Sequence, residues 1–451
     1  MAKYKAYPEY KDSGVEWLGE VPNHWKTVSI SRLFSRIKRT GYTEKELLSV
    51  YRDYGVIPKS SRDDNNNKPS EDLSPYQLVE PNDLVMNKMK AWQGSIAISE
   101  YEGIVSPAYF VYKPNNVLFE LAHPRYVHYL LRNPIYVTQY LSRSKGIRVN
   151  QWDLDPDEFR NIELLLPDKT EQEKIYSFLD HETAKIDNLI EKQQQLIELL
   201  KEKRQAVISH AVTKGLNPDV PMKDSGVEWL GEVPAHWTVS TIKHISTFIG
   251  TGGTPKNSES FTDDDGIDWF SPGDFNGSLS LRYAKKKITT QAVSNGDAKS
   301  YPKDSIVVIG IGATLGKVAF VEHEFSCNQQ INIITPSKTV DHKYLTYSLL
   351  NQVEQMKQSS NASTIGIMNQ EKTKQIWIAV PPKDEQIKIV SVLSQKEIEF
   401  DELLKKSEYQ ILLLQERRTA LISAAVTGKI DVRDWGVPNT QDIEEPEEAI
   451  A

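Results

Sequence analysis

Hydrophobic residues recur every seven or fourteen positions along two stretches of the chain, and both stretches predict long helices. In residues 168–213 one seam holds Leu179, Ile186 and Leu200, and the complementary seam holds Ile175, Leu189 and Leu196. In the second stretch one seam holds Leu393, Phe400, Leu414 and Leu421, and the other holds Ile389 and Leu403. Each helix of ~45 residues would be ~65 Å long. Because a lone helix would leave its apolar stripe in water, we expect the two to pair as an antiparallel coiled coil. The alternative is two core helices of separate globular domains.

Between these helices the pattern predicts a mixed α+β fold. Short β-branched runs alternate with short helical segments and with clusters of Gly, Pro and Asn. The predicted strands include residues 305–309, 318–321, 331–334 and 376–380, and the predicted helices include residues 125–132 and 343–358. We therefore predict two mixed α and β domains joined by the two long helices.

The chain is an internal duplication. KDSGVEWLGEVPNHW (residues 11–25) and KDSGVEWLGEVPAHW (residues 223–237) agree at fourteen of fifteen positions. PDKTEQEKI from Pro167 corresponds to PPKDEQIKI from Pro381, and residues 203–215 correspond to residues 417–429. We call each set of matched segments, together with its long helix, a frame. The inserts between the matched segments share little. A frame present twice indicates the same contact made twice in a pseudo-twofold arrangement, whereas unlike inserts indicate unlike targets.

The repeated segment WLGEVPxHW contains four of the nine tryptophans. Tryptophan at fixed spacing with Gly and Pro predicts a strap packed on a surface, with its indole N–H groups hydrogen-bonded. We expect a structural role, with direct partner contact as the alternative.

These patterns predict five segments. They are a first mixed α and β domain (1–167), a central long helix (168–215), a second mixed α and β domain (216–380), a C-terminal long helix (381–430) and an acidic, disordered tail (431–451). The tail contributes −6 of the formal net charge of −8, so the rest of the chain is nearly neutral. The single cysteine, Cys327, excludes an internal disulfide framework, and the sequence has neither a signal-peptide pattern nor a long apolar run. We expect a cytoplasmic protein without a membrane span.

Basic clusters in both inserts predict a nucleic-acid interface. Residues 121–152 contain five basic residues, four tyrosines among them and no acid until the following Asp153. Arg and Lys neutralise phosphates, while Arg, Asn and Gln also hydrogen-bond base edges. The candidates are Lys88, Lys90, Arg143, Lys145, Arg148, Asn150 and Gln151 in the first insert, and Thr254, Lys256, Arg282, Lys285, Lys286, Lys287, Lys357 and Asn361 in the second. The alternative is a solvated basic face without a ligand.

These motifs together resemble the specificity subunits of Type I restriction–modification enzymes. The first shared motif is SGxxWLGxxPxHW, at residues 13–25 and 225–237. The second is a strand followed by PPxxEQxxI or a variant of it, at residues 164–175 and 378–389. The third is RxxxIxxAVTG or a variant of it, which ends each long helix at residues 204–215 and 418–428. The second insert adds GTGGTP (250–255) and IDWFSPGDF (267–275), which look like the family's target-recognition domains; the first insert lacks the GTGGTP opening.

The resemblance implies that this chain recognises DNA and catalyses no reaction itself. Each target-recognition domain would bind half of a bipartite double-stranded DNA target, and the paired helices would set the gap between the halves. The helices would dock two methyltransferase subunits, and two restriction–translocase subunits would join that complex. The expected docking residues are Ile175, Leu179, Ile186, Leu189, Leu196, Leu200, Ile389, Leu393, Phe400, Leu403, Leu414 and Leu421. S-adenosylmethionine, ATP and magnesium would be bound by those partners, and this chain would bind no cofactor or metal. Rival functions are a DNA-modifying enzyme with a divergent active site and a protein-only scaffold.

Three motifs in the sequence look catalytic but fail on inspection. Asn133-Pro-Ile-Tyr136 differs from the adenine methyltransferase motif NPPY at Ile135, and we expect a helix break there. GIGATLGK (residues 310–317) lacks the spacing and the Ser or Thr of a phosphate loop, which favours a tight turn between strands. His323 and Cys327 form no complete metal-ligand set.

Overall fold

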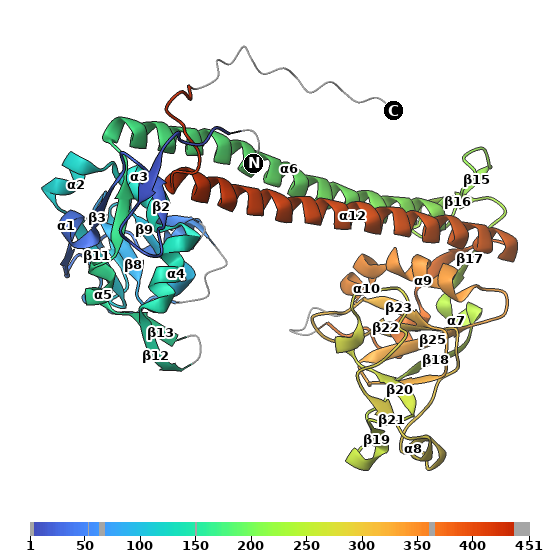
Figure 1. Ribbon diagram of the computed structural model, residues 1–451. Coiled ribbons are helices and arrows are strands. Elements are labelled where there is room, and N and C mark those ends of the chain that lie inside the picture. Colours follow the sequence, from blue (N-terminus) through green and yellow to red (C-terminus); the bar gives the residue numbers. More distant parts are fainter. Residues whose placement is uncertain (1–3, 53, 63–67, 149–150, 360–365, 437–451) are drawn as a thin grey trace. The chain divides into compact units, whose positions relative to one another are not determined.

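The computed structural model describes residues 4–52, 54–62, 68–148, 151–359 and 366–436. The chain forms two compact units, residues 1–193 with 409–451 and residues 194–408. Two long helices, α6 (Lys169–Thr213) and α12 (Lys383–Val426), each contribute one half to each unit (Figure 1).

In the first unit, the strap that contains Trp25 is an antiparallel hairpin of β1 (Tyr10–Asp12) and β2 (Glu20–Pro22). The first lobe, residues 26–166, begins with β3 (Lys26–Ser29) and ends with β14 (Glu163–Leu166), and these two strands pair with each other. This pairing brings both ends of the insert back to the frame.

The centre of the first lobe is a four-stranded sheet in the order β4–β11–β8–β9. These strands are β4 (Phe34–Ile37), β11 (Tyr109–Pro114), β8 (Leu84–Asn87) and β9 (Ile96–Ile98). Three two-stranded ladders accompany it: β5 (Leu48–Tyr51) with β6 (Gly55–Pro58), β7 (Gln77–Val79) with β10 (Gly103–Val105), and β12 (Ser144–Arg148) with β13 (Gln151–Leu154). The short helices are α1 (Ile30–Leu33), η1 (Lys59–Ser61), η2 (Ala91–Gln93), α2 (Asn116–Leu121), α3 (Pro124–Leu131), α4 (Pro134–Ser142) and α5 (Pro156–Arg160).

Buried tyrosines join α3 and α4 to the core of the first lobe. Tyr126, Tyr136 and Tyr140 are fully buried. The hydroxyl of Tyr126 donates to the carbonyl of Leu165 at 2.9 Å, and the hydroxyl of Tyr136 accepts from the backbone N–H of Leu165 at 3.1 Å. Three of the four tyrosines among the arginines of residues 121–152 are therefore core residues whose polar ends are satisfied, because an unpaired buried hydroxyl would be costly.

The second unit repeats this plan. Its strap is the hairpin β15 (Met222–Asp224) and β16 (Glu232–Pro234), and its lobe, residues 238–380, is closed by β17 (Thr238–Thr241) pairing with β26 (Trp377–Val380). The central sheet has the order β18–β25–β22–β23, with β18 (Ser246–Thr251), β25 (Ile331–Pro336), β22 (Ser305–Ile309) and β23 (Val318–Val321). The strands β8 and β22 hold the same third place in the strand orders of the two central sheets.

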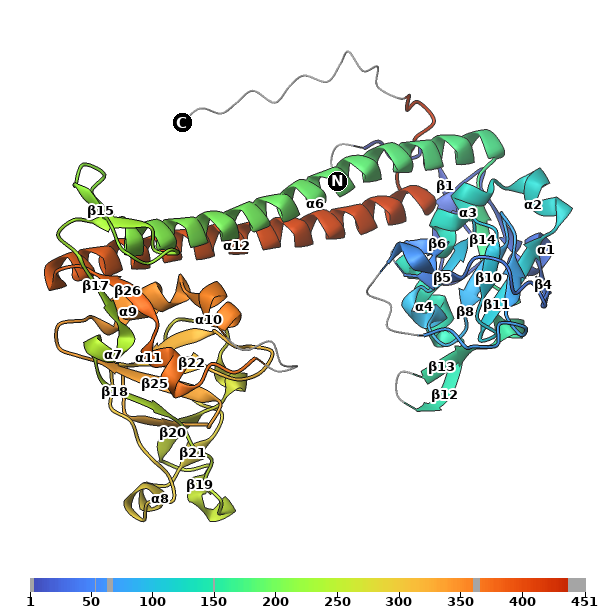
Figure 2. The same ribbon diagram turned by 180° about the vertical axis from the view of Figure 1, so that it is seen from behind.

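The second lobe differs by a further sheet, in the order β19–β21–β20–β24. Its strands are β19 (Phe261–Thr262), β21 (Lys287–Ile288), β20 (Ile267–Phe270) and β24 (Phe325–Cys327). The short helices of this unit are α7 (Ile242–Ile245), η3 (Ser258–Ser260), η4 (Pro272–Asp274), α8 (Thr290–Ser294), α9 (His342–Leu350), α10 (Val353–Ser359) and α11 (Gln370–Lys374). Within this unit α9 and α10 lie beside the long helices, and β19, β20, β21 and α8 lie at the opposite end of the lobe (Figures 1 and 2).

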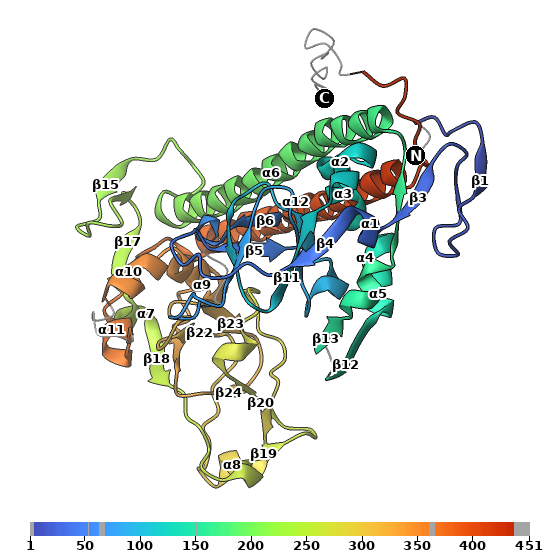
Figure 3. The same ribbon diagram turned by 90° about the vertical axis from the view of Figure 1, so that its left-hand side faces the viewer.

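The two long helices pack antiparallel, which confirms the predicted pairing; their course is also visible in Figure 3. In the second unit Arg204 of α6 contacts Glu397 of α12 at 2.8 Å, and in the first unit Arg418 of α12 contacts Asp187 of α6 at 2.8 Å. The start of each helix thus lies beside the end of the other.

One seam of each long helix is as predicted, and the other is shifted. Leu179, Ile186, Leu393, Phe400 and Leu421 are buried, as are Ile175 and Ile389, so these seven side chains pack within this chain and are not exposed for docking a partner. Leu189, Leu196 and Leu403, however, are 47%, 41% and 47% exposed. Ile197 is buried at the next position after Leu196, and Ile190 and Leu404 are half-buried at the next positions after Leu189 and Leu403. The second seam was placed one residue too early, because adjacent apolar residues in the sequence offered two registers.

The acidic tail begins later than the sequence indicated. Val432 is buried, the backbone N–H of Asp431 donates to the carbonyl of Lys5 at 2.8 Å, and the ring of Trp435 packs on Phe178. The prediction of a disordered tail is wrong for residues 431–436, since their apolar side chains are covered by the first unit. Residues 437–451 lie outside the described residues.

Candidate functional site

Glu171, in the first turn of α6, holds the first strap by three side chains. Its Oε1 accepts from the indole N–H of Trp25 at 3.2 Å and from the hydroxyl of Tyr7 at 2.5 Å, and its Oε2 lies 2.6 Å from Nε2 of His24. The carboxylate is only 3% exposed, and its position at a helix N-terminus favours its negative charge. The pKa of Tyr7 is raised well above its usual value, mainly by burial and secondly by the hydrogen bond to Glu171. The strap is thus fixed to the helix start.

Glu385 repeats this arrangement at the start of α12. Its Oε2 accepts from the indole N–H of Trp237 at 3.1 Å and lies 2.9 Å from Nε2 of His236. The predicted packing of both straps is confirmed, and the predicted hydrogen bonding of the indole N–H groups is confirmed for Trp25 and Trp237. Trp17 and Trp229 form no such hydrogen bond within the described residues. The sequence analysis missed Glu171 and Glu385 themselves, although both stand in the duplicated segments PDKTEQEKI and PPKDEQIKI.

Each strap also contacts the end of the other long helix. A Cβ at Gly428, just after α12, would lie 2.3 Å from Cδ of Pro22, and one at Gly215, just after α6, would lie 3.1 Å from Cζ2 of Trp237. Both glycines have positive φ (+74° and +78°), so a side chain is disfavoured by backbone conformation and by space. Each strap therefore bridges the start of one long helix and the end of the other.

Two further pairs of residues join each lobe to its frame in the same way. The Gln172 side chain donates to the carbonyl oxygens of Leu121 and Pro167, and the Gln386 side chain donates to those of Thr339 and Pro381. The Tyr344 hydroxyl donates to the carbonyl of Ala379 at 2.8 Å, as Tyr126 does to Leu165. The duplicated segments thus make duplicated contacts.

In the first lobe, three of the predicted DNA-binding lysines lie at one hairpin. The backbone N–H of Leu154 donates to the carbonyl of Lys88, and Trp92 contacts Trp152 with ring centroids 5.0 Å apart, so the β12–β13 hairpin packs on η2. Nζ of Lys88 is 3.0 Å from Asp153, Nζ of Lys145 is 3.8 Å from Asp155, and Lys90 is exposed. Arg148 and Gln151 pair in register across this hairpin, but their side chains, and all of Asn150, lie outside the described residues.

Arg143 has a structural contact at the end of α4. Its Nη1 donates to the carbonyl of Gln139 at 3.3 Å and to the side chain of the same residue. A cation at a helix C-terminus is stabilising there without any ligand. The assignment of Arg143 to DNA therefore remains a prediction.

In the second lobe, most of the candidates gather around the additional sheet. Nε1 of Trp269 donates to the carbonyl of Gly253 at 3.0 Å, which holds the loop with Thr254 and Lys256 against β20. Lys286 lies over the ring of Phe261 in β19 at 5.5 Å. Arg282, Lys285 and Lys287 lie in or next to β21, and all of these candidate residues are exposed except the half-buried Lys287.

Lys357 does not join this group. It lies on α10 beside α9 and forms an ion pair with Glu354, one helical turn away, at 2.7 Å. The two groups are apart because α10 and the additional sheet lie at opposite ends of the lobe (Figure 1). Asn361 lies outside the described residues.

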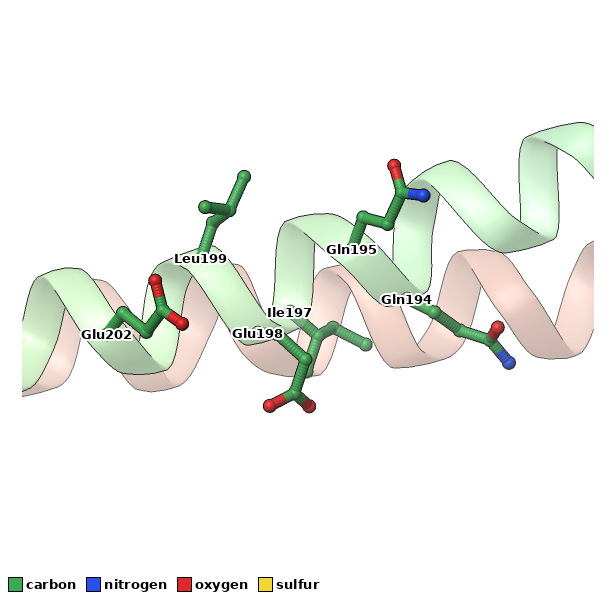
Figure 4. Close-up of a pocket in the computed structure, with 6 residues that line it drawn as sticks. All are labelled: Gln194, Gln195, Ile197, Glu198, Leu199 and Glu202. Atoms are coloured by element: carbon green, nitrogen blue, oxygen red, sulfur yellow. The ribbon is translucent and has the colours of Figure 1, made fainter.

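Two surface hollows lie among the described residues. One, along α6, is lined by Gln194, Gln195, Ile197, Glu198, Leu199 and Glu202 (Figure 4). Another, of about 310 Å³, lies between Trp229, α10 and α11. Neither contains a nucleophile beside a base, and the described residues contain no group of three or more His, Cys, Asp or Glu side chains placed to bind a metal.

The three catalytic-looking motifs have structural roles. Asn133 caps α4, since its Oδ1 accepts from the N–H of Ile135 at 2.9 Å, which confirms the expected break between α3 and α4. Residues 310–317 form the turn between the antiparallel strands β22 and β23, as expected. Nε2 of His323 lies 2.9 Å from Asp268, while Cys327 is buried and its pKa is raised by desolvation.

Comparison with known proteins identifies the duplicated unit. The family model for the Type I restriction modification DNA specificity domain matches residues 22–199 and 234–413. The chain is 21% identical over 449 residues to the StySPI specificity subunit of Salmonella potsdam, covering 93% of this chain and 92% of that relative. It is 30% identical over 193 residues to the MjaIX specificity subunit of Methanocaldococcus jannaschii; that match spans 42% of this chain and 43% of the relative.

Solved structures have the same fold. One, described as the structural basis underlying complex assembly and conformational transition of the type I R-M system, aligns with a TM-score of 0.70 at 15% identity, over 91% of this chain and 99% of that chain. The HsdS subunit from Thermoanaerobacter tengcongensis aligns with a TM-score of 0.52 at 15% identity, over 91% of this chain and 98% of that subunit. Among the helices that the structure describes, none has both the length and the apolar character needed to span a bilayer.

Proposed function

The chain belongs to the Type I restriction modification DNA specificity domain family, and we propose that each of its two lobes binds one half of a bipartite DNA target. It contains two copies of the family domain and is a Type I specificity subunit, whose function is DNA target recognition. The observation that supports the division of labour is that the two frames make the same contacts, while the lobes between them differ at their outer ends.

The basic groups at the outer ends of the lobes are the proposed contact surfaces. The first group is Lys88, Lys90 and Lys145, and the second is Lys256, Arg282 and Lys285–Lys287. Each lies at the end of its own lobe away from its long-helix segments (Figures 1 and 2). Phosphate contacts from such groups would position the duplex, and amide or guanidinium contacts in the grooves would select bases.

The frames are the proposed docking surfaces for protein partners. A duplicated frame suits two copies of one subunit, because each copy meets the same residues. Exposed apolar side chains on the long helices, among them Leu189, Leu196, Leu199, Leu403 and Leu412, are available for such contacts. The proposed partners are two methyltransferase subunits, followed by restriction–translocase subunits, in the cytoplasm.

The chain itself would neither methylate nor cut DNA. S-adenosylmethionine, ATP and magnesium would act in the partner subunits. A test is the purified chain incubated with duplex DNA and labelled S-adenosylmethionine, alone and with its co-expressed methyltransferase subunit. Methyl transfer by the chain alone would contradict this assignment and favour a modifying enzyme.

The decisive experiment for target recognition is a domain exchange read by methylome sequencing. Replacing residues 30–165 with the insert of another specificity subunit should change one half of the methylated sequence and leave the other half as it was. A change of both halves, or of neither, would refute one lobe per half-site. Binding to the mapped duplex that weakens steeply with salt would separate DNA recognition from a protein-only scaffold.

A further inference from the structure

Tyr283 is the most exposed large apolar side chain that the structure describes. It is 84% exposed, while the next, Leu199, is 61% exposed. It lies between Leu281 and Lys285, in the segment that leads into β21 at the outer end of the second lobe. Its ring has no aromatic or cationic neighbour in the parts of the chain that the structure describes, so its exposure is not explained by packing.

The backbone on both sides of Tyr283 is held firmly. The N–H of Leu281 donates to the carbonyl of Phe320 at 3.0 Å, and the side chain of Leu281 is buried. The N–H of Ala284 donates to Asp268 at 3.1 Å, and the N–H of Lys285 donates to Asp274 at 3.0 Å. Asp268 and Asp274 are fixed in turn by His323 and Ser271. The ring is therefore presented by a rigid loop, and little backbone entropy would be lost when a ligand covers it.

The charges next to the ring indicate what covers it. Residues 279–288 contain Arg282, Lys285, Lys286 and Lys287 and no Asp or Glu. Arg282 is exposed, and Lys285 uses one of its N–H donors on the carbonyl of Gly273 at 3.0 Å. An exposed aromatic ring between cations matches a nucleic acid, in which flat bases lie between phosphates.

We propose that the Tyr283 ring packs against nucleobases of the half-site that the second lobe binds, with Arg282 and Lys285 on the flanking phosphates. This rests on the function proposed above and adds a specificity-determining contact to it. Minor-groove proteins insert apolar side chains as wedges between base steps of duplex DNA. The contact would select sequence through base shape and step deformability as well as through hydrogen bonds.

The test uses the full chain assembled with its methyltransferase subunits and a duplex oligonucleotide that carries the methylation site mapped above. Tyr283→Ala should lower affinity for this duplex about tenfold or more and lower affinity for an unrelated duplex less. Tyr283→Phe should retain most of the affinity, because the ring remains. Tyr101→Ala, which removes an exposed tyrosine of the first lobe, is the matched control and should bind as the unaltered complex does.

Salt dependence separates the ring from the cations. Arg282→Ala should reduce the slope of log affinity against log salt by about 1, whereas Tyr283→Ala should leave this slope unchanged. Unchanged target affinity of Tyr283→Ala would overturn the proposal. It would also be overturned if this variant assembled less well with the methyltransferase subunits while the complexes that did form bound DNA as the unaltered complex does, since the ring would then contact protein. If the unaltered complex did not prefer the mapped duplex, the proposed function itself would fail.

Discussion

Glu171 and Glu385 hold their straps through the same two contacts, but the first carboxylate is 3% exposed and the second is 27% exposed. The difference comes from residues outside the repeat. Tyr7 adds a third hydrogen bond to Glu171, and the guanidinium of Arg433 covers the Tyr7 ring at 5.1 Å. One sequence motif therefore exists in two environments, which shows that its shielding depends on the flanking segments.

The lobes show the complementary contrast. Both contain a four-stranded sheet with equivalent strand order, but the first carries a hairpin at its outer end and the second a further sheet. The hairpin carries Lys145, and the further sheet carries Lys287 with Lys285 and Lys286 beside it, although Lys88 follows β8 of the shared sheet. Divergence is thus concentrated where a different target would require it.

The largest expected difference between the two frames follows removal of the carboxylates. Glu171→Ala leaves the Trp25 indole, the Tyr7 hydroxyl and His24 without their shared acceptor in a buried site, at a cost of ~3–5 kcal/mol. Glu385→Ala, in a wetter site, should cost about 1 kcal/mol. Hydrogen exchange of β2 in the first variant and of β16 in the second measures both, with the exposed Glu173→Ala as control. Equal losses of stability in the two variants would mean that the segments flanking the repeat do not affect how strongly each carboxylate holds its strap.

His128 provides an acid-sensitive difference between the lobes. Burial and the neighbouring Arg132, whose Nη1 donates to His128 Nε2 at 2.8 Å, lower the pKa of His128 from 6.5 to about 3. Between these values the unfolded chain binds more protons than the folded one, so stability is lost as pH falls below 6.5, by roughly 2 kcal/mol at pH 5. The corresponding residue of the second lobe, Thr346, is buried and does not titrate.

His128→Thr should therefore remove this acid sensitivity, and the melting of the first unit should vary less between pH 7.5 and pH 5. Calorimetry at a series of pH values checks it, with His210→Thr at an exposed position as control. An unchanged pH dependence would show that His128 titrates in the same range folded and unfolded.

The first tryptophan of each strap should matter to a different extent. The half-buried Trp17 packs edge-on against Tyr136 with ring centroids 5.0 Å apart, whereas Trp229 is 44% exposed and has no ring partner among the described residues. Trp17→Ala should cost ~1.5 kcal/mol and Trp229→Ala ~0.5 kcal/mol. Denaturant titration monitored by amide hydrogen exchange in β1 and β15 compares the stability lost in the two variants. A larger loss for Trp229→Ala than for Trp17→Ala would contradict the packing argument.

The smallest effect concerns the arginines between the long helices. Arg204 contacts both Glu397 and Asp401, whereas Arg418 contacts only Asp187 among the described residues, because Thr183 occupies the position that corresponds to Glu397. Partial exposure limits these pairs, so we expect a coupling of ~1 kcal/mol for Arg204 and ~0.5 kcal/mol for Arg418, both weaker in salt. Double-mutant cycles that pair Arg204→Ala with Glu397→Ala and with Asp401→Ala, and Arg418→Ala with Asp187→Ala, measure these couplings. No coupling between Arg204 and Glu397 would show that Glu397 adds nothing.

Local patterns sufficed for much of the fold. The heptads placed α6 and α12 at nearly their observed bounds, and the duplicated segments indicated two frames with paired indole groups. The break at Asn133 was also predicted correctly, because caps and turns depend on neighbouring residues. Each of these features is encoded within a few positions of the chain.

The tertiary structure decided which of several local possibilities is used. Leu196 and Ile197 are adjacent and equally apolar, and only the approach of α12 determines that Ile197 is buried. Glu171 is one of several acids at a helix start, and it becomes the anchor of a strap because β2 and Tyr7 arrive from far away in the sequence. Tyr283 and the core tyrosine Tyr136 are chemically identical, and their exposure differs because burial depends on distant residues.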